Sequence, residues 1–173
     1  MLAFVVTSLV CFLTYLFLTT GSGSIAGLWS IEEILLGLLL SLFAGFISQN
    51  IFIKDSYRMA NPKRWLLFLV YLFGPFFIGM AKANFDVAYR VITGKINPGI
   101  VRISPGIKTD LGITMLANSI TLTPGTLSVD VDEKTNDLYV HWINVKEEAL
   151  KKKPVDERYI CGSFPKWVRR IAE

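Results

Sequence analysis

The N-terminal half of the chain alternates long apolar runs with short polar stretches. Leu2 to Thr20 is uncharged, and no acidic or basic side chain occurs before Glu32. A run of about 19 residues rises far enough as a helix to cross a hydrocarbon core roughly 30 Å thick. It lacks the basic start and the small-residue cleavage site of a signal peptide, so we expect it to stay in the protein. The pattern therefore predicts a first span at about residues 2–20.

A second apolar run predicts a second span at about residues 34–53. Ser30 followed by Glu32 and Glu33 is typical of a helix start, because a serine can cap the first turn and acids favour the positive end of the helix dipole. Small residues recur along the run at spacings of three and four, at Gly37, Ser41, Ala44, Gly45 and Ser48. This spacing predicts a smooth face on which another helix packs closely.

A third apolar stretch runs from Trp65 to Ala81 and continues as a helical pattern to about residue 92. It contains Gly74-Pro75, which predicts a kink. The preceding loop, residues 54–64, has four basic residues and one acid, so it is expected on the cytoplasmic side. Both ends of the stretch are basic, which conflicts with a full crossing. We favour a hairpin of two spans with the third helix lying shallow or packed on a partner; three spans with an external N-terminus are the alternative.

Three charged residues follow this stretch at helical spacing. Lys82, Asp86 and Arg90 share one helix face, four residues apart, which predicts a juxtamembrane ion pair. The alternative is that Lys82 and Asp86 belong to an ion path. No charge lies in the middle of any apolar run, where an ionisable residue is expensive and kept for function. The chain by itself therefore lacks a complete proton or sodium route.

The polar half predicts a small α+β domain with a short, mainly antiparallel sheet. Ile100 to Ile103 form a short strand pattern, and Thr109 or Asp110 can cap a helix that ends before Pro124-Gly125. Leu127, Val129 and Val131 alternate with polar residues, as in a half-buried strand. The run 138–145 is largely apolar on both faces, so we expect it either to be the middle strand of the sheet or to be covered by the helix on one side, and to pair with its predecessor as a hairpin.

These patterns divide the chain into a membrane region, residues 1–93, and a small soluble α/β domain, residues 94–173, with a charged tail from Lys146. Trp167 to Ile171 can place a basic amphipathic turn on lipid or on a neighbour, or the tail can be solvated. We expect the cell membrane as location, with several spans and a cytoplasmic C-terminal domain.

Composition supports a membrane protein. Of the 173 residues 52% are hydrophobic and 18% charged, too apolar a mixture for one soluble core. The net charge of +4 is scattered around apolar runs rather than massed with aromatic residues, so no nucleic-acid partner is expected. Cys11 and Cys161 lie far apart and match no metal or redox spacing.

We find no catalytic, cofactor or metal motif. His141 is the only histidine, which excludes a zinc site built from several histidines and favours a structural role. No glycine-rich loop of the phosphate-binding kind follows a strand and opens a helix. The sequence therefore predicts that the chain is not itself an enzyme and has no cofactor of its own.

Several segments together resemble the E-type subunits of the multisubunit Mrp/Mnh cation–proton antiporters. The resemblance covers about residues 83–145 by motif, and the earlier spans by hydropathy. Its motifs are Met115 to Thr126, Val129-Asp130-Val131, Leu138-Tyr139-Val140-His141, Ala83-Asn84, Val87-Ala88 and Pro98-Gly99-Ile100-Val101. The same subunit type occurs in the antiporter-like arm of membrane-bound hydrogenases and sulfane sulfur reductases, so the parent complex can be a redox enzyme.

The resemblance implies a non-catalytic accessory or assembly subunit of a membrane complex that exchanges sodium for protons, with other membrane subunits and the lipid bilayer as partners. Within its motif we expect a structural turn, in which hydroxyl groups bind backbone groups at a helix end. The residues of this turn are Asn118, Thr121, Thr123, Pro124, Gly125 and Thr126. The alternatives are a membrane-anchored binding module and a self-sufficient small cation transporter.

Overall fold

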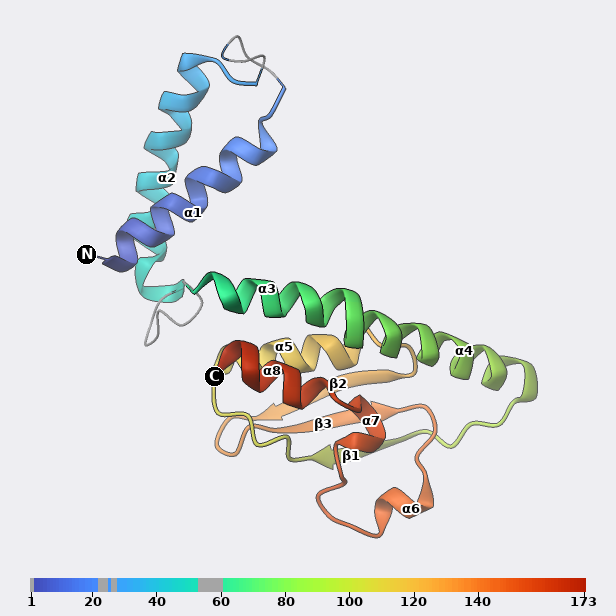
Figure 1. Cartoon of the computed structure of the whole chain (residues 1–173). Coiled ribbons are helices and arrows are strands. Elements are labelled where there is room, and N and C mark those ends of the chain that lie inside the picture. The colour runs from blue at the N-terminus through green and yellow to red at the C-terminus, as the bar shows by residue number, and fades with distance from the viewer. Residues whose placement is uncertain (1, 22–24, 26–27, 53–60) are drawn as a thin grey trace. The chain divides into compact units, whose positions relative to one another are not determined.

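The computed structural model describes residues 2–21, 25, 28–52 and 61–173. The chain divides into two compact units, residues 1–57 and 58–173, and Figure 1 labels their elements. Most of the cytoplasmic loop expected at residues 54–64, and most of the turn at 21–24, lie outside the described residues.

The first unit is a helical hairpin. Helix α1 spans Leu2–Leu18 and helix α2 spans Ile31–Phe52 (Figure 1). The predicted start of α2 is confirmed as a reciprocal cap: the Glu33 N–H donates to Ser30 Oγ (3.2 Å), and the Ser30 N–H donates to Glu33 Oε2 (2.8 Å). The helices bury small residues where they meet: Ser41 is buried, and a side chain at Gly45 would run into Ser8 of α1. The smooth face predicted on α2 is thus the packing face of the hairpin.

The second unit begins with one long helix. It consists of α3 (Pro62–Tyr71), a π-helical turn η2 (Leu72–Phe76) and α4 (Phe77–Thr93). The Lys63 N–H donates to the Asn61 side chain at its start, and Gly94 ends it in a left-handed conformation. The kink predicted at Gly74-Pro75 takes the form of the π-turn, which accommodates a proline that has no N–H to donate.

Two helices are long and apolar enough to cross a membrane by length and composition, Ile31–Ser48 within α2 and Pro62–Thr93; Phe4–Leu18 is a shorter apolar helix. The predicted fold class, an apolar hairpin and a third apolar helix followed by a small α+β domain, is confirmed.

The sheet has three antiparallel strands: β1 (Gly99–Ile103), β2 (Thr126–Asp132) and β3 (Asp137–Trp142), in the order β1-β3-β2. The prediction that the last strand is the middle one is confirmed, and its buried members Leu138, Val140 and Trp142 explain its apolar character. Helix α5 (Asp110–Thr121) begins at the predicted cap, where Thr109 Oγ1 accepts from the Gly112 N–H (3.2 Å).

Strand β2 departs from the alternation seen in its sequence. The register with β3 shifts between Ser128 and Asp130, which places Val129 in a bulge. Leu127 and Val129 are exposed, whereas Ser128 is half-buried and donates its Oγ–H to the Ala117 carbonyl (3.0 Å). The apolar residues of the strand therefore do not share one buried face, because the bulge resets which side chains point toward α5.

The C-terminal tail folds into three short helices, α6 (Glu147–Leu150), α7 (Arg158–Cys161) and α8 (Phe164–Ala172). We expected Trp167 to Ile171 to rest on lipid or a neighbour or to be solvated, whereas the apolar side of α8 packs against the chain's own second unit. The α8 residues Phe164, Val168 and Ile171 are buried in the core of this unit. In Figure 1 the second unit is layered, with α5 and α8 covering one face of the sheet and the long helix covering α5 and α8.

Candidate assembly surface

The turn between α5 and β2 is built by threonine hydroxyls that bind backbone carbonyls. Thr123 Oγ1 donates to the Ser119 carbonyl (2.8 Å), and Thr126 Oγ1 donates to the Ile120 and Thr123 carbonyls (2.7 and 2.9 Å). Thr121 Oγ1 accepts from the Ser128 N–H (3.2 Å). These bonds tie the hydroxyl groups to carbonyls at the end of α5 and in the turn and to the first residues of β2, so the turn holds a fixed path into the sheet.

Gly125 is the point at which this turn meets its surroundings. Its φ of +85° favours glycine, and its carbonyl accepts from the Ile143 N–H (2.9 Å). A β-carbon here would lie 2.9 Å from Ile143 Cγ2 and 3.1 Å from Val87 Cγ2 of α4. The turn therefore touches the long helix as well as the sheet, and no larger residue fits without displacing one of them.

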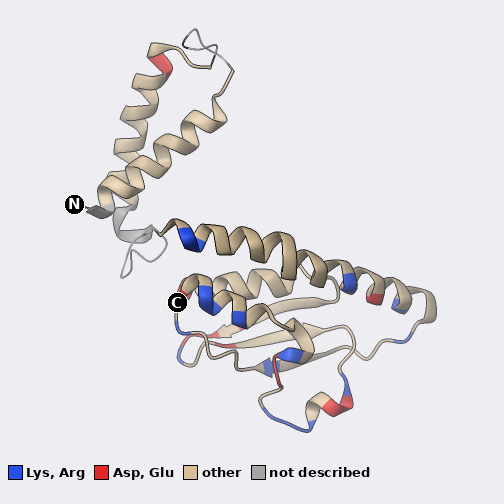
Figure 2. Cartoon of the chain, in the orientation of Figure 1, with Lys and Arg blue, Asp and Glu red and all other residues tan. Residues whose placement is uncertain are grey.

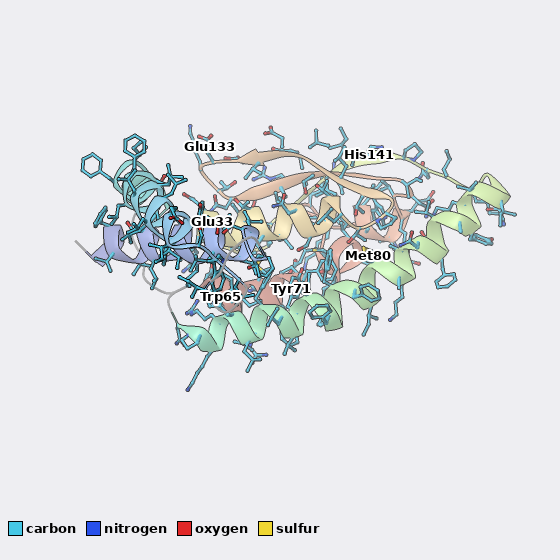
Figure 3. The ribbon with its side chains drawn as sticks, turned by 90° about the horizontal axis from the view of Figure 1, so that it is seen from above. Glu33, Trp65, Tyr71, Met80, Glu133 and His141 are labelled. Atoms are coloured by element: carbon cyan, nitrogen blue, oxygen red, sulfur yellow. The ribbon has the colours of Figure 1, made fainter. Side chains whose placement is uncertain are left out.

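Tyr71 is the central contact of the long helix with the domain. Its hydroxyl donates to Ser119 Oγ (2.7 Å), and Ser119 Oγ donates onward to the Met115 carbonyl (2.8 Å). The ring lies edge-on to Phe164 (5.8 Å between centroids) and near Trp167 (6.5 Å). Figure 3 shows Tyr71 and Met80 on the side of the helix that faces the rest of the unit.

Arg64 fixes the start of the long helix against the end of α8. Its Nη1 donates to the Ile171 carbonyl (2.6 Å), where α8 leaves carbonyls without helical partners. A guanidinium also matches the negative end of the α8 dipole. The long helix is therefore held by polar bonds at its first turn and at its middle.

The predicted juxtamembrane ion pair involves two of its three residues. Arg90 binds Asp86 through two bonds (2.7 and 2.8 Å), and its Nη1 also donates to the Lys95 carbonyl (3.0 Å). Lys82 is exposed and has no salt bridge within the described residues.

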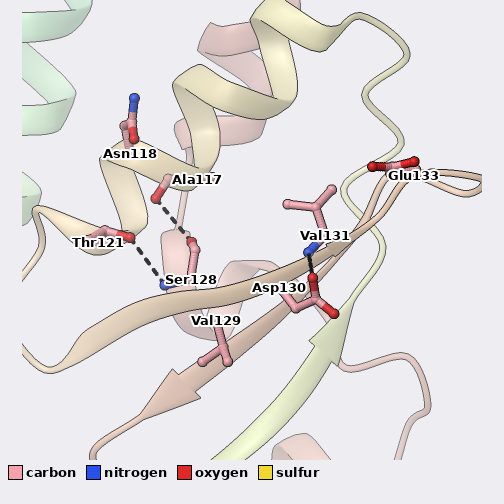
Figure 4. Close-up of a pocket in the computed structure, with 8 residues that line it drawn as sticks. All are labelled: Ala117, Asn118, Thr121, Ser128, Val129, Asp130, Val131 and Glu133. Carbon is pink, nitrogen blue, oxygen red and sulfur yellow. Dashed lines mark hydrogen bonds between the residues drawn. The ribbon is translucent and has the colours of Figure 1, made fainter.

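Asn118 and Thr121 line an open groove of about 420 Å³ between α5 and β2 (Figure 4). Figure 3 places Glu133 at one end of the sheet and His141 on its central strand. The acids of the groove are Asp130 and Glu133, and Asp130 Oδ1 accepts from the Val131 N–H (2.9 Å). Among the described residues, no three His, Cys, Asp or Glu side chains gather as metal ligands.

The two cysteines and the histidine take no part in these surfaces. Both cysteines are free thiols. Cys161 is buried in the core, and this burial raises its pKa to about 12, so its thiol is protonated at neutral pH. His141 is half-buried on the outer face of the sheet, between Ile100 and Leu127 in the strand register.

Comparison with known proteins now identifies the family. The profile described as "Na+/H+ ion antiporter subunit" (MNHE) matches residues 8–171. The chain belongs to this antiporter subunit family. The E-type Na+/H+ antiporter subunit of Alkalihalophilus pseudofirmus is 33% identical over 69% of this chain and 75% of its own length. The E1-type antiporter subunit of Staphylococcus haemolyticus is 31% identical over 86% of this chain and 89% of its own length.

A solved structure extends the match to nearly the whole chain. A chain of the membrane-bound sulfane sulfur reductase, an archaeal respiratory membrane complex, is 37% identical, covers 98% of both chains and superposes with a TM-score of 0.77. The resemblance drawn from the sequence is thereby confirmed, and so is the expectation of a membrane protein that works among other subunits. This antiporter subunit family thus occurs both in antiporters and in a respiratory complex.

Sequence reasoning missed the contacts of Tyr71, Arg64 and α8. The signal for α8 was present, since Phe164, Trp167, Val168 and Ile171 follow helical spacing and form one apolar face. No sequence signal pairs Tyr71 with Ser119, 48 residues away.

Proposed function

We propose that this chain is an accessory subunit, without an ion path of its own, that supports assembly of a complex exchanging sodium for protons. The observation that carries the proposal is the place of its charges. Within the described residues, the hairpin helices hold only Glu32 and Glu33, both in the first turn of α2 (Figure 2). A group that hands a cation across a bilayer has to titrate or bind near its middle.

The contacts of the second unit support a structural role. The threonines of the motif bond to backbone groups, and Tyr71 and Arg64 of the long helix are occupied in holding α5 and α8. The ion movement expected of the complex is therefore assigned to other subunits. The parent complex is either a stand-alone antiporter or the ion-translocating module of a respiratory complex; the near-complete match to the sulfane sulfur reductase chain favours the second.

The test is purification of the tagged full-length chain from its native membrane in mild detergent. We expect it to elute in a large assembly that catalyses Na+/H+ exchange after reconstitution, and the chain reconstituted alone to catalyse none. A monodisperse single subunit that exchanges cations by itself would contradict the proposal. Identifying the co-purified subunits decides between the two parent complexes, since redox subunits accompany only the respiratory type.

A further inference from the structure

The long helix touches the domain along a distance comparable to the thickness of a bilayer. Its contacts begin at Arg64, which binds Ile171, and pass through Tyr71 and through Gly79, where a β-carbon would lie 2.9 Å from Phe164 Cζ. They reach Val87, beside Gly125. From Arg64 to Val87 is about 35 Å at 1.5 Å per residue.

The elements packed against this face are charged and hydrated. Helix α8 carries exposed Lys166 and Arg170, and α5 begins with exposed Asp110. If the long helix crossed the membrane, Lys166, which lies between the Tyr71 contacts Phe164 and Trp167, would lie beside the helix within the hydrocarbon, at a cost of several kcal/mol. A helix bound to a hydrated domain over its whole length cannot at the same time stand upright in lipid.

The opposite face of the helix is largely apolar and exposed within the unit. Exposed fractions are 73% for Phe73, 79% for Phe85 and 84% for Ile92. The other exposed apolar residues of this face are Trp65, Leu66, Leu69, Val70, Phe77, Ile78 and Tyr89. Figure 2 shows this stretch free of charge between the basic start of α3 and the middle of α4. An apolar stripe that is interrupted by exposed Lys82, with aromatic residues near both ends, matches a helix lying in the membrane interface, where a lysine side chain can reach the headgroups.

The charge of the long helix and the length of chain before it both indicate that a lipid surface covers the apolar stripe. Residues 61–95 hold five basic side chains and one acid, a balance that attracts an anionic leaflet. Nine residues, 53–61, separate the end of α2 from Pro62 and reach about 30 Å when extended, so the long helix begins within that distance of the end of α2. A bilayer surface is therefore within reach of the stripe.

We propose that Pro62–Thr93 is not a third span but a lateral helix, which inserts its apolar stripe at the headgroup boundary of the cytoplasmic leaflet. Both of its ends then lie on the same side of the membrane, and the sheet points away from lipid. The helix serves as a platform that holds the α+β domain at a fixed depth and orientation.

The first test is cysteine labelling of the intact complex in sealed vesicles. The background carries Cys11→Ala and Cys161→Ala, and single cysteines replace Lys63, Lys95 and, as a reference in the domain, Lys108. A membrane-impermeant maleimide should label all three in inverted vesicles and none in right-side-out vesicles. Labelling of positions 63 and 95 from opposite sides would overturn the proposal, because only a crossing helix separates its ends.

The second test decides what covers the stripe. Spin labels at Phe73→Cys and Phe77→Cys in the complex in nanodiscs should be accessible to oxygen and shielded from a water-soluble nickel chelate. Leu127→Cys is the matched control, since it is an exposed apolar position on the outer face of the sheet and should show the reverse. Labels at 73 and 77 that are inaccessible to both reagents would mean that a protein subunit covers the stripe, and accessibility to the chelate would mean that water does; either result contradicts insertion into lipid.

Discussion

The hairpin and the long helix have almost the same mean hydropathy, but their buried residues pack against different partners. The best window of α2 has a mean hydropathy of 1.9, and that of Pro62–Thr93 has 1.8; few residues of either are buried. In the hairpin the buried residues are small and face a second apolar helix. In the long helix they are Tyr71 and Phe76, which face a domain that carries charge on its surface. Apolar composition thus measures the capacity to span a membrane, whereas the packing partner decides whether a helix does so.

Replacing Tyr71 removes the buried contact that ties the long helix to the domain. Tyr71→Ala removes a buried ring and leaves Ser119 without its donor, so the second unit should lose about 3–5 kcal/mol of stability. Phe73→Ala, two residues away on the exposed stripe, should change it by less than about 0.5 kcal/mol. Limited proteolysis of this subunit in the purified complex, carried out over a range of temperatures, measures the change in stability for both variants. Equal effects would show that the helix is not anchored through this face.

Gly125→Val tests the contact between the turn and α4. The left-handed backbone costs a β-branched residue about 1–2 kcal/mol, and collision with Ile143 and Val87 adds about 1–3 kcal/mol. Gly94→Val is the control, because Gly94 has a φ of +68° and no atom within 4 Å of an added β-carbon. Yield of assembled complex on native gels should fall further for Gly125→Val, with unchanged cation preference in what remains. Normal assembly with altered cation preference would contradict the structural role of the turn; Pro124→Ala should act in the same direction more weakly.

Gly45→Ala tests the packing of the hairpin. The added methyl group would collide with Ser8, including its backbone, and we expect a loss of about 1–3 kcal/mol. Gly74→Ala in the long helix has no atom within 4 Å of its new methyl group and should be tolerated. The amount of this subunit recovered in the complex compares the two. An intact complex in both variants would mean that the small-residue face is not needed for assembly.

Acid should weaken the second unit through Asp137. Burial raises the pKa of Asp137, but hydrogen bonds from Ser104 and from Arg102 (Nε to Oδ2, 2.8 Å) outweigh it and hold the pKa below its ordinary value of 3.8. A lowered folded-state pKa contributes stability above pH 3.8 that is lost as the pH falls through the folded value.

Protease susceptibility of the subunit from about pH 5 down to about pH 2 should therefore rise more steeply for the native chain than for Asp137→Asn, which has no such proton to take up. The same pH dependence in both forms would place the acid-sensitive group elsewhere.

Most of the fold followed from pattern, because periodicity records which side chains a helix or strand buries. The hairpin, the long helix, the cap at Thr109 and the middle strand were predictable for this reason. The bulge at Val129 was not, since it depends on a register that only pairing with β3 defines. The helical spacing of the apolar residues of α8 was visible, but what they pack against was not, because its basic residues resemble those of a solvated tail until a partner for its apolar face is known.

The candidate site was predictable only where its bonds are local. The threonines around Pro124-Gly125 bind carbonyls within six residues along the chain, so residue type and spacing carry the information. Tyr71 with Ser119 and Arg64 with Ile171 join segments 48 and 107 residues apart, and only the folded chain brings them together.

If this subunit supports ion exchange without conducting ions, ion exchange should not depend on the charged side chains near its apolar helices. A complex carrying Glu32→Gln, Glu33→Gln, Lys82→Gln and Asp86→Asn together lacks the two acids of the hairpin helices and the charges at positions 82 and 86 of the long helix, while the amide oxygen introduced at position 33 can still accept from the Ser30 N–H and cap α2. We predict that sodium-driven proton movement in inverted vesicles, normalised to assembled complex, equals that of the native complex at every sodium concentration. Full assembly with exchange abolished would show that the chain supplies part of the ion path.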